Sequence, residues 1–239
     1  MESMAAAAEK FRSVIANRLF VFDMDGTLLS NTTACIEIAR ATGTLDQVTV
    51  LEQQFAAGEI DAFRFAQQIA ALWGLVDRQI VRTAFKATPK LRNIEAVTAR
   101  IRNGGGISCL ITMSPDFYAH LFYDYGFDFI EASEFPRSLG EELLPAKILN
   151  PEDKAVIVRK LCQDRGLEMN RCVAFGDSMS DYLLFRELQH TVSVNGDPTL
   201  QAFARYRYDG LDLQDAFLAI CNQLLNDHPA TERPDTAER

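Results

Sequence analysis

The chain runs Arg18-Leu19-Phe20-Val21-Phe22-Asp23-Met24-Asp25-Gly26-Thr27 where a short apolar segment meets an acidic turn. The aromatic and branched side chains of residues 18–22 stop abruptly at Asp23, which predicts a fully buried strand. Side chains two residues apart on an extended backbone point the same way, so the carboxylates of Asp23 and Asp25 leave the strand end together. The alternative is an acidic turn in which Asp25-Gly26 supplies only turn chemistry.

Two carboxylates held this closely favour a bound cation. At a separation of ~4 Å, two unit charges repel by about 4 kcal/mol at an effective dielectric of 20. Mg²⁺ characteristically binds one or two carboxylates together with phosphate oxygens, and a carboxylate can itself attack a phosphoryl group. The acidic turn therefore points toward magnesium and phosphoryl chemistry.

Three later segments repeat the pattern of a short apolar run, and together they predict a parallel sheet. They are Ile107 to Thr112, Cys172 to Phe175, and Thr191 to Val194. Helical segments separate the runs, which is typical of an α/β fold with a Rossmann-like parallel sheet and helices on both faces. Residues 1–30 and 103–226 are predicted to form this core.

Residues 31–102 differ from the rest, because apolar side chains recur there at helical spacing and strand-like runs are absent. We predict a small helical cap domain inserted after the first strand. Gly43, Gly58 and Gly74 mark the expected breaks between its helices. Residues 227–239 contain prolines and many polar side chains, which predicts a disordered tail.

The net charge argues against polyanionic partners. Twenty-four basic and 33 acidic residues give a formal net charge of -9, and the basic residues form no run. Nucleic acid and anionic membranes are bound through Lys and Arg, so we expect neither as a partner. Five cysteines without a C-x-x-C pair favour a reducing compartment, and the first ten residues lack the features of a signal peptide. A cytoplasmic protein is the expectation.

A second acidic turn, Gly176-Asp177-Ser178-Met179-Ser180-Asp181, directly follows the run that ends at Phe175. Parallel sheets place ligand sites at the carboxyl ends of their strands, so Asp177 is expected in the same crevice as the first acidic turn. Asp181 lies one helical turn further and could support the site from behind. The alternative for Asp177 is a helix N-cap, where aspartate is common.

Thr112 and Lys154 are the remaining candidates for phosphate binding. Thr112 ends its apolar run, where its hydroxyl and the backbone N–H of Met113 could cradle phosphate oxygens. Lys154 falls in the first turn of a helix predicted from Pro151 to Asp164, where a cation opposes the helix dipole. This unfavourable placement raises the weight of a functional role. The ordinary alternatives are a strand-end threonine and a solvated lysine, and Lys147 competes for the same role.

The order of these segments resembles the four motifs of haloacid dehalogenase superfamily phosphohydrolases. The resemblance extends from about Leu19 to Asp215 and is carried by Asp-x-Asp-Gly-Thr, a strand-end threonine, a lysine and Gly-Asp-x-x-x-Asp. It implies an enzyme that uses Mg²⁺ to cleave the phosphate ester of a small metabolite.

The resemblance also implies a role for each motif residue. Asp23 would attack phosphorus, and Asp25 would act as acid and then as base. The phosphate oxygens would be held by Thr112, Met113 and Lys154. The metal would be held by Asp23, the carbonyl of Asp25, and Asp177, while Asp181 would orient Lys154 or a metal-bound water.

Within the superfamily the chain is similar to the phosphoserine phosphatase branch, but two departures bear on the substrate. Thr32 or Thr33 stands where those enzymes carry a cap glutamate that grips the substrate ammonium. Gln67 falls near the position of their cap arginine, although Arg64 is close enough to substitute. Without both grips a zwitterionic amino acid would be poorly paired. We therefore expect a sugar, polyol or amino-alcohol phosphate, with phosphoserine less favoured.

Two other functions remain open at this point. A phosphomutase would pass the same aspartyl phosphate to a second substrate hydroxyl instead of to water. A non-catalytic relative would bind a phosphorylated ligand without cleaving it, although the complete set of motif residues argues against this.

Overall fold

The computed structural model describes residues 4–138 and 140–227, and within them six strands form one parallel sheet. The strand order is β3-β2-β1-β4-β5-β6, and every neighbouring pair is parallel. The predicted α/β class is therefore confirmed. The strands are β1 (Leu19–Phe22), β2 (Ile107–Pro115), β3 (Phe129–Ser133), β4 (Cys172–Gly176), β5 (His190–Val194) and β6 (Tyr206–Tyr208).

The two edge strands, β3 and β6, lie outside the apolar runs of the sequence. In β3, buried Ile130 is followed by exposed Glu131, and β6 is the short sequence Tyr-Arg-Tyr. Edge strands face solvent along one side, so their sequences need not be continuously apolar. Strand β2 also differs from its prediction, because it continues past Thr112 to Pro115.

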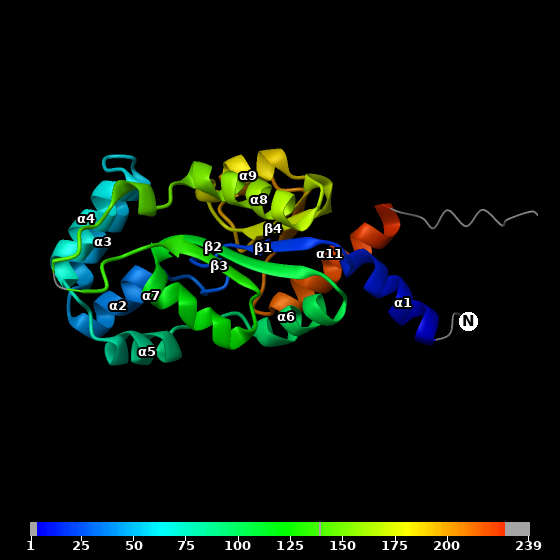
Figure 1. Cartoon of the computed structure of the whole chain (residues 1–239), viewed down its shortest axis with the longest axis horizontal. Coiled ribbons are helices and arrows are strands. Elements are labelled where there is room, and N and C mark those ends of the chain that lie inside the picture. The colour runs from blue at the N-terminus through cyan, green and yellow to red at the C-terminus, as the bar shows by residue number, and fades with distance from the viewer. Residues whose placement is uncertain (1–3, 139, 228–239) are drawn as a thin grey trace, which may run out of the picture.

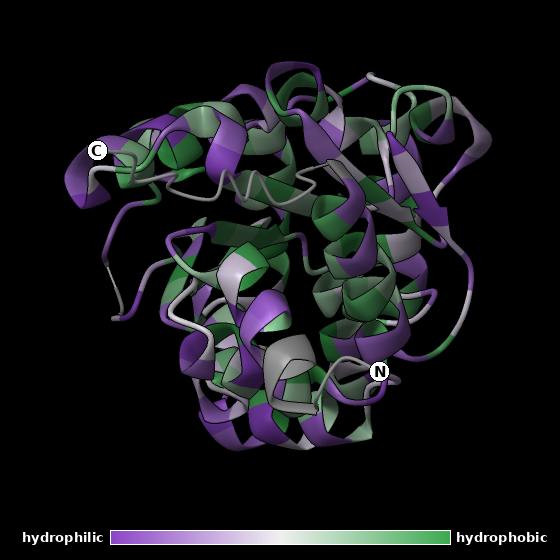
Figure 2. Ribbon diagram, turned by 90° about the vertical axis from the view of Figure 1, so that its right-hand side faces the viewer, coloured by the Kyte–Doolittle hydropathy of each residue, from purple (hydrophilic) through white to green (hydrophobic). Residues whose placement is uncertain are grey.

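Helices cover the sheet in two layers, one on each face (Figure 1). In β1, Phe20 and Phe22 belong to one hydrophobic cluster, while Leu19 and Val21 belong to another on the opposite face. Figure 2 shows hydrophobic residues concentrated on the strands and hydrophilic residues on the outer helix faces. The first layer contains α1 (Met4–Ile15), α6 (Ile94–Asn103) and α11 (Leu213–Asp227), and the second contains α8 (Pro151–Arg165), α9 (Tyr182–Glu187) and α10 (Pro198–Gln201).

Four helices gather at the end of the sheet that lies opposite the N-terminus (Figure 1). They are α2 (Ala34–Thr42), α3 (Leu45–Ala56), α4 (Ala62–Trp73) and α5 (Arg78–Ala87). Local sequence sets their ends: the side chains of Thr33, Asp61 and Asp77 accept hydrogen bonds from first-turn N–H groups of α2, α4 and α5. Gly43, in the left-handed conformation, ends α2.

Helix α2 is shared between two hydrophobic clusters. Its residues Cys35 and Ala39 pack with α3 and α4 in a separate cap cluster. Its residues Ala34 and Ile38 belong to the large cluster on the sheet. The cap is therefore built on α2, which is also part of the core.

Helix α6 belongs with the sheet by its contacts, although the predicted cap extends to residue 102. Its residues Ile94, Val97 and Ile101 lie in the same cluster as Phe20 and Phe22. An amphipathic helix cannot be assigned to cap or core from its spacing alone, since both give the same apolar stripe. We propose that the cap ends before α6.

The remaining elements are short connections. They are α7 (Asp116–Ala119) and 3₁₀ turns at His120–Tyr125, Pro145–Lys147, Met169–Arg171 and Met179–Asp181. Helix α11 ends at Asp227, and the rest of the predicted tail lies outside the described residues. Across the described ranges, every helix is too short or too polar to cross a bilayer.

Candidate active site

Three neighbouring strands deliver the predicted site residues to one edge of the sheet. Asp23 follows β1, Asp177 follows β4, and Thr112 lies near the end of β2. The chain reverses its direction of travel across the sheet beside β1, and such switch points open a crevice at the carboxyl ends of the strands. The rings of Phe22 and Phe175, which are paired in register, stack at 4.6 Å and fix these two strand ends together.

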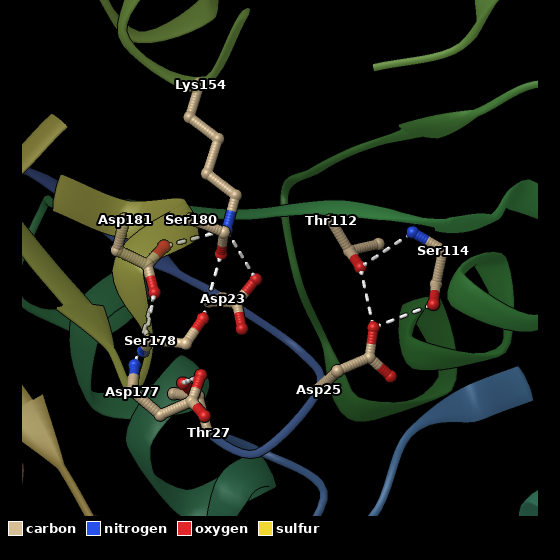
Figure 3. Close-up of polar contacts among 10 residues, drawn as sticks. All are labelled: Asp23, Asp25, Thr27, Thr112, Ser114, Lys154, Asp177, Ser178, Ser180 and Asp181. Atoms are coloured by element: carbon tan, nitrogen blue, oxygen red, sulfur yellow. Dashed lines mark hydrogen bonds and ion pairs between the residues drawn. The ribbon is translucent and has the colours of Figure 1, made fainter. Parts of the chain in front are cut away.

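The ammonium of Lys154 lies at the centre of the site (Figure 3). Its Nζ donates to Oδ1 of Asp23 and to Oδ1 of Asp181, both at 2.7 Å, and to the hydroxyl of Ser180 at 3.2 Å. The side chain enters from the first turn of α8, whose start is fixed by a capping box between Asn150 and Asp153. Since Lys154 is only 1% exposed, these acceptors replace the water it gives up.

Burial and charge act in opposite directions on this cluster. Burial alone would lower the pKa of Lys154, but the carboxylates of Asp181 and Asp23 raise it above its ordinary value. Burial raises the pKa of Asp23 to about 7, even though the nearby ammonium of Lys154 opposes this shift. The ammonium of Lys154 therefore stays charged, whereas burial favours the protonated form of Asp23.

A third carboxylate completes a candidate metal site. Oxygens of Asp23, Asp177 and Asp181 lie within 4.8 Å of one another. Burial raises the pKa of Asp177 to about 9, and the charges of Asp23 and Asp181 add to the shift. A bound cation would favour the ionised form of all three carboxylates, which together with the ammonium of Lys154 then carry a net charge of about -2. An oxygen-only donor set with this charge suits Mg²⁺.

One member of this carboxylate cluster, Asp181, is not a metal ligand in the sequence interpretation. The sequence interpretation places the carbonyl of Asp25 in the metal site and puts Asp181 behind it. The carboxylate of Asp181 instead belongs to the cluster, although both of its oxygens already accept hydrogen bonds, from Lys154 and from the backbone N–H groups of Asp177 and Ser178. The side chain of Asp25 points elsewhere (Figure 3), and its carbonyl stays a prediction.

Gly26 leaves room for the carboxylate of Asp177. A Cβ atom at Gly26 would lie 2.1 Å from Oδ2 of Asp177, and the backbone φ of +73° is one that side chains disfavour. Thr27 Oγ1 donates to Oδ1 of the same carboxylate at 3.4 Å. The Asp-Gly-Thr sequence thus shapes the metal site as well as the turn.

We expect Gly26→Ala to weaken metal binding at least about 10-fold and to reduce turnover in parallel, because the new methyl group displaces Asp177. Titration calorimetry with Mg²⁺ measures the first effect. The matched control is Gly58→Ala, since Gly58 has a similar φ of +71° but nothing within 4 Å of its added Cβ. Equal losses in both variants would mean that backbone strain, and not the contact with Asp177, is responsible.

The side chain of Asp25 lies apart from the cluster of three carboxylates, in a second group of hydrogen bonds. Its Oδ2 accepts from the hydroxyls of Ser114 at 2.7 Å and Thr112 at 3.2 Å, and its Oδ1 accepts from the N–H of Ala34 at 2.6 Å. Burial raises the pKa of Asp25, against the opposing effect of these three donors. A carboxyl with a raised pKa is suited to giving and taking a proton.

Ser114 is a site residue that the sequence interpretation misses. The predicted strand ends at Thr112, whereas β2 continues, so the side chains of Thr112 and Ser114 point the same way. The pairing of β2 with β3 is irregular between Thr112 and Pro115, and Met113 lies in this irregular stretch. The signal that could have found Ser114 is its spacing of two residues from Thr112.

Lys147 and the four specificity candidates make hydrogen bonds outside the group around Lys154 and Asp23. Lys147 is at the surface, where it donates to Glu134 at 2.6 Å. Thr32 donates to Glu37 at 2.6 Å. Thr33 donates to Glu52. Arg64 and Gln67 are exposed on α4, where Arg64 donates to Gln67 at 3.3 Å.

Comparison with known proteins agrees with this geometry. The phosphoserine phosphatase of Idiomarina loihiensis is 26% identical over 202 residues, which cover 82% of this chain and 90% of that protein. The phosphoserine phosphatase of Methanocaldococcus jannaschii is 21% identical over 201 residues, which cover 83% and 95%. A solved structure described as a phospho-aspartyl intermediate analogue of phosphoserine phosphatase shares the fold, with a TM-score of 0.72 and 20% identity over 85% of this chain and 99% of that one.

The family model of haloacid dehalogenase-like hydrolases matches residues 20–186, which is well over half of the 239 residues. The matched region contains all residues of the two hydrogen-bonded groups described above, the one around Lys154 and the one around Asp25. The chain therefore belongs to the haloacid dehalogenase-like hydrolase family.

Proposed function

We propose that this chain is a Mg²⁺-dependent phosphatase that cleaves a small phosphate monoester through an aspartyl phosphate on Asp23. The proposal rests on three groups that lie together. Asp23 is buried and bound by Lys154, the carboxylates of Asp177 and Asp181 lie close to it, and Asp25 is held by Ser114. The phosphoserine phosphatase relatives and the family match support the same chemistry.

The residues suggest a two-step route. An oxygen of Asp23 forms a bond to phosphorus while the ester bond to the alcohol breaks, and Asp25 gives its proton to the departing alcohol oxygen. Asp25 then takes a proton from a water molecule whose oxygen bonds to phosphorus while the bond from Asp23 to phosphorus breaks. Inorganic phosphate leaves, Asp23 is again a free carboxylate and Asp25 is again protonated. Lys154 and Thr112 would bind the non-bridging phosphate oxygens, whose charge must be stabilised throughout the transfer.

Mg²⁺ is the cofactor that the cluster of Asp23 and Asp177 suits, and when bound it would offset charge between the nucleophile and the phosphate. Asp181 is better suited to hold Lys154 and the backbone of Asp177, because its oxygens already accept three hydrogen bonds. This supports its proposed orienting role.

We expect Mg²⁺ to raise the melting temperature of the wild-type protein by about 5–10 °C. A ligand at about 100 times its Kd stabilises by about 2.7 kcal/mol, and each kcal/mol shifts Tm by about 2–4 °C in a chain of this size. Differential scanning calorimetry with and without Mg²⁺ tests this. Asp177→Asn should abolish the shift, and KCl at equal ionic strength controls for screening. An equal shift in Asp177→Asn would place the metal elsewhere.

A panel of phosphate monoesters assayed for phosphate release with Mg²⁺ and with EDTA tests the proposed activity. Phosphorus NMR of the products separates the alternatives: a phosphatase releases one phosphate per ester consumed, whereas a phosphomutase returns an isomeric ester. The relatives named phosphoserine phosphatases make phosphoserine an obligatory member of the panel. Sugar, polyol and amino-alcohol phosphates remain the expected substrates, because the threonines at positions 32 and 33 carry no charge.

We also propose a cytoplasmic location. All five cysteines lie in the described part of the chain, are buried and form no disulfide. Cys162 and Cys172 keep free thiols even though their sulfur atoms are 3.2 Å apart. Unpaired thiols at this spacing suit a reducing compartment.

A further inference from the structure

We propose that Glu52 binds a positively charged amine on the alcohol part of the substrate, and that the substrates are phosphate esters of short amino alcohols without a carboxylate. The inference rests on the proposed phosphatase function and assigns a specificity residue to it. Glu52 lies on α3, outside every sequence motif discussed above.

Glu52 is connected to the catalytic acid through two consecutive residues of the chain. The hydroxyl of Thr33 donates to Oε1 of Glu52, and the N–H of the next residue, Ala34, donates to Oδ1 of Asp25 at 2.6 Å. Both carboxylates therefore contact the start of α2. Their charges also act on a common neighbour, because both raise the pKa of the Cys35 thiol, after the larger effect of its burial.

The carboxylate of Glu52 is incompletely satisfied. A carboxylate offers about four acceptor sites, and within the described residues Thr33 is its sole hydrogen-bond donor. Burial raises the pKa of Glu52 to about 7, and the charge of Asp25 adds to this shift while the Thr33 hydroxyl opposes it. A half-buried acid with spare acceptors is stabilised by a cationic donor, which would also restore its charge.

Glu37, a glutamate in the same region, has both a threonine donor and a cationic partner. It accepts from Thr32 at 2.6 Å, as Glu52 accepts from Thr33, but Arg40 also lies 3.4 Å away. No ion pair links Glu52 to any described cation. We infer that the cationic partner of Glu52 is supplied by a ligand.

Helices α2, α3 and α4 offer no comparable partner for a substrate carboxylate. From Ala34 to Trp73 the chain has two cationic side chains, Arg40 and Arg64. Arg40 is engaged by Glu37, and Arg64 is exposed and donates to Gln67. A carboxylate placed beside Glu52 would meet the negative charges of Glu52 and Asp25. An amine is therefore favoured there, and an amino acid is not.

The test compares four esters in the wild-type protein and in Glu52→Gln. They are phosphoethanolamine (amine), O-phosphoserine (amine and carboxylate), glycerol 3-phosphate (hydroxyls) and p-nitrophenyl phosphate (no polar donor). Glutamine keeps an oxygen that can accept from Thr33, so the cap stays intact while the charge is lost. We expect kcat/KM for phosphoethanolamine to fall about 10- to 100-fold, the range for a hydrogen bond to a charged group, and the values for glycerol 3-phosphate and p-nitrophenyl phosphate to change less than about 3-fold.

Glu37→Gln is the matched control, because it removes a threonine-bound glutamate whose charge is already balanced. It should leave the preference for phosphoethanolamine unchanged. Wild-type turnover of O-phosphoserine at or above the rate for phosphoethanolamine would overturn the substrate class. Equal losses on all four esters in Glu52→Gln would overturn the role of Glu52 and leave the phosphatase standing. No phosphate release from any ester by the wild type would instead overturn the phosphatase itself.

Discussion

Asp23→Asn is expected to fold like the wild type and to lose at least about 10³-fold in kcat on every substrate, as variants of covalent nucleophiles do. Asparagine has nearly the same shape and still offers an oxygen to Lys154, which keeps its second carboxylate partner, Asp181, at 2.7 Å. The amide cannot form the acyl phosphate. Phosphate release in the steady state measures the loss, and mass spectrometry of acid-quenched protein should find a phosphorylated Asp23 in the wild type alone.

The control for this variant is Asp124→Asn, the same chemical change at an exposed position. It should retain wild-type turnover. Near-ultraviolet circular dichroism of both variants shows whether the fold is kept. Turnover above a few per cent in Asp23→Asn, with the fold intact, would mean that a different group attacks phosphorus.

Lys154→Met should lower both stability and turnover. Methionine keeps a long unbranched chain in a site that is 1% exposed, but it leaves the carboxylates of Asp23 and Asp181 without their ammonium. Removing one partner of a buried ion pair lowers the free energy of unfolding by about 3–5 kcal/mol, because the other charge stays buried. Urea unfolding at neutral pH in metal-free buffer measures this. Turnover should fall at least about 10²-fold, since the phosphate oxygens lose a fixed cation.

Lys147→Met is the matched control, because Lys147 is a nearby lysine whose ammonium contacts Glu134 at the surface. Its stability and turnover should stay close to those of the wild type. A Lys154→Met protein that is as stable and active as Lys147→Met would show that the buried ammonium contributes nothing to either property.

The central part of the fold is predictable because its strands are buried on both faces. Strands β1 and β4 are continuous apolar runs, and a polar residue directly after such a run must lie at the carboxyl edge of the sheet. This reasoning locates Asp23 and Asp177 without coordinates. The helix from Pro151 is predictable for a different reason, since its capping residues form a local signal that needs no tertiary contact.

The features that escape prediction depend on contacts between distant residues. The edge strands β3 and β6 carry polar residues because one side of each is open. Helix α6 has the spacing of any amphipathic helix, and only its packing on the sheet assigns it to the core. Glu52 meets Thr33 across 19 residues, so its place near Asp25 appears only when α2 and α3 pack together.

The double membership of α2 has a consequence for how this enzyme can diversify. The N–H of Ala34, at the start of this helix, donates to Asp25, and its inner face packs in the sheet cluster. A shift of α2 would therefore also move the carboxylate of Asp25. Helices α3 and α4 pack with the outer face of α2 and with Phe135 and Ile148, and within the described residues neither donates a hydrogen bond to Asp25. Substitutions in them can exchange one alcohol for another while the cleavage machinery stays the same. Substrate selectivity would then depend on α3 and α4, and the position of Asp25 on α2.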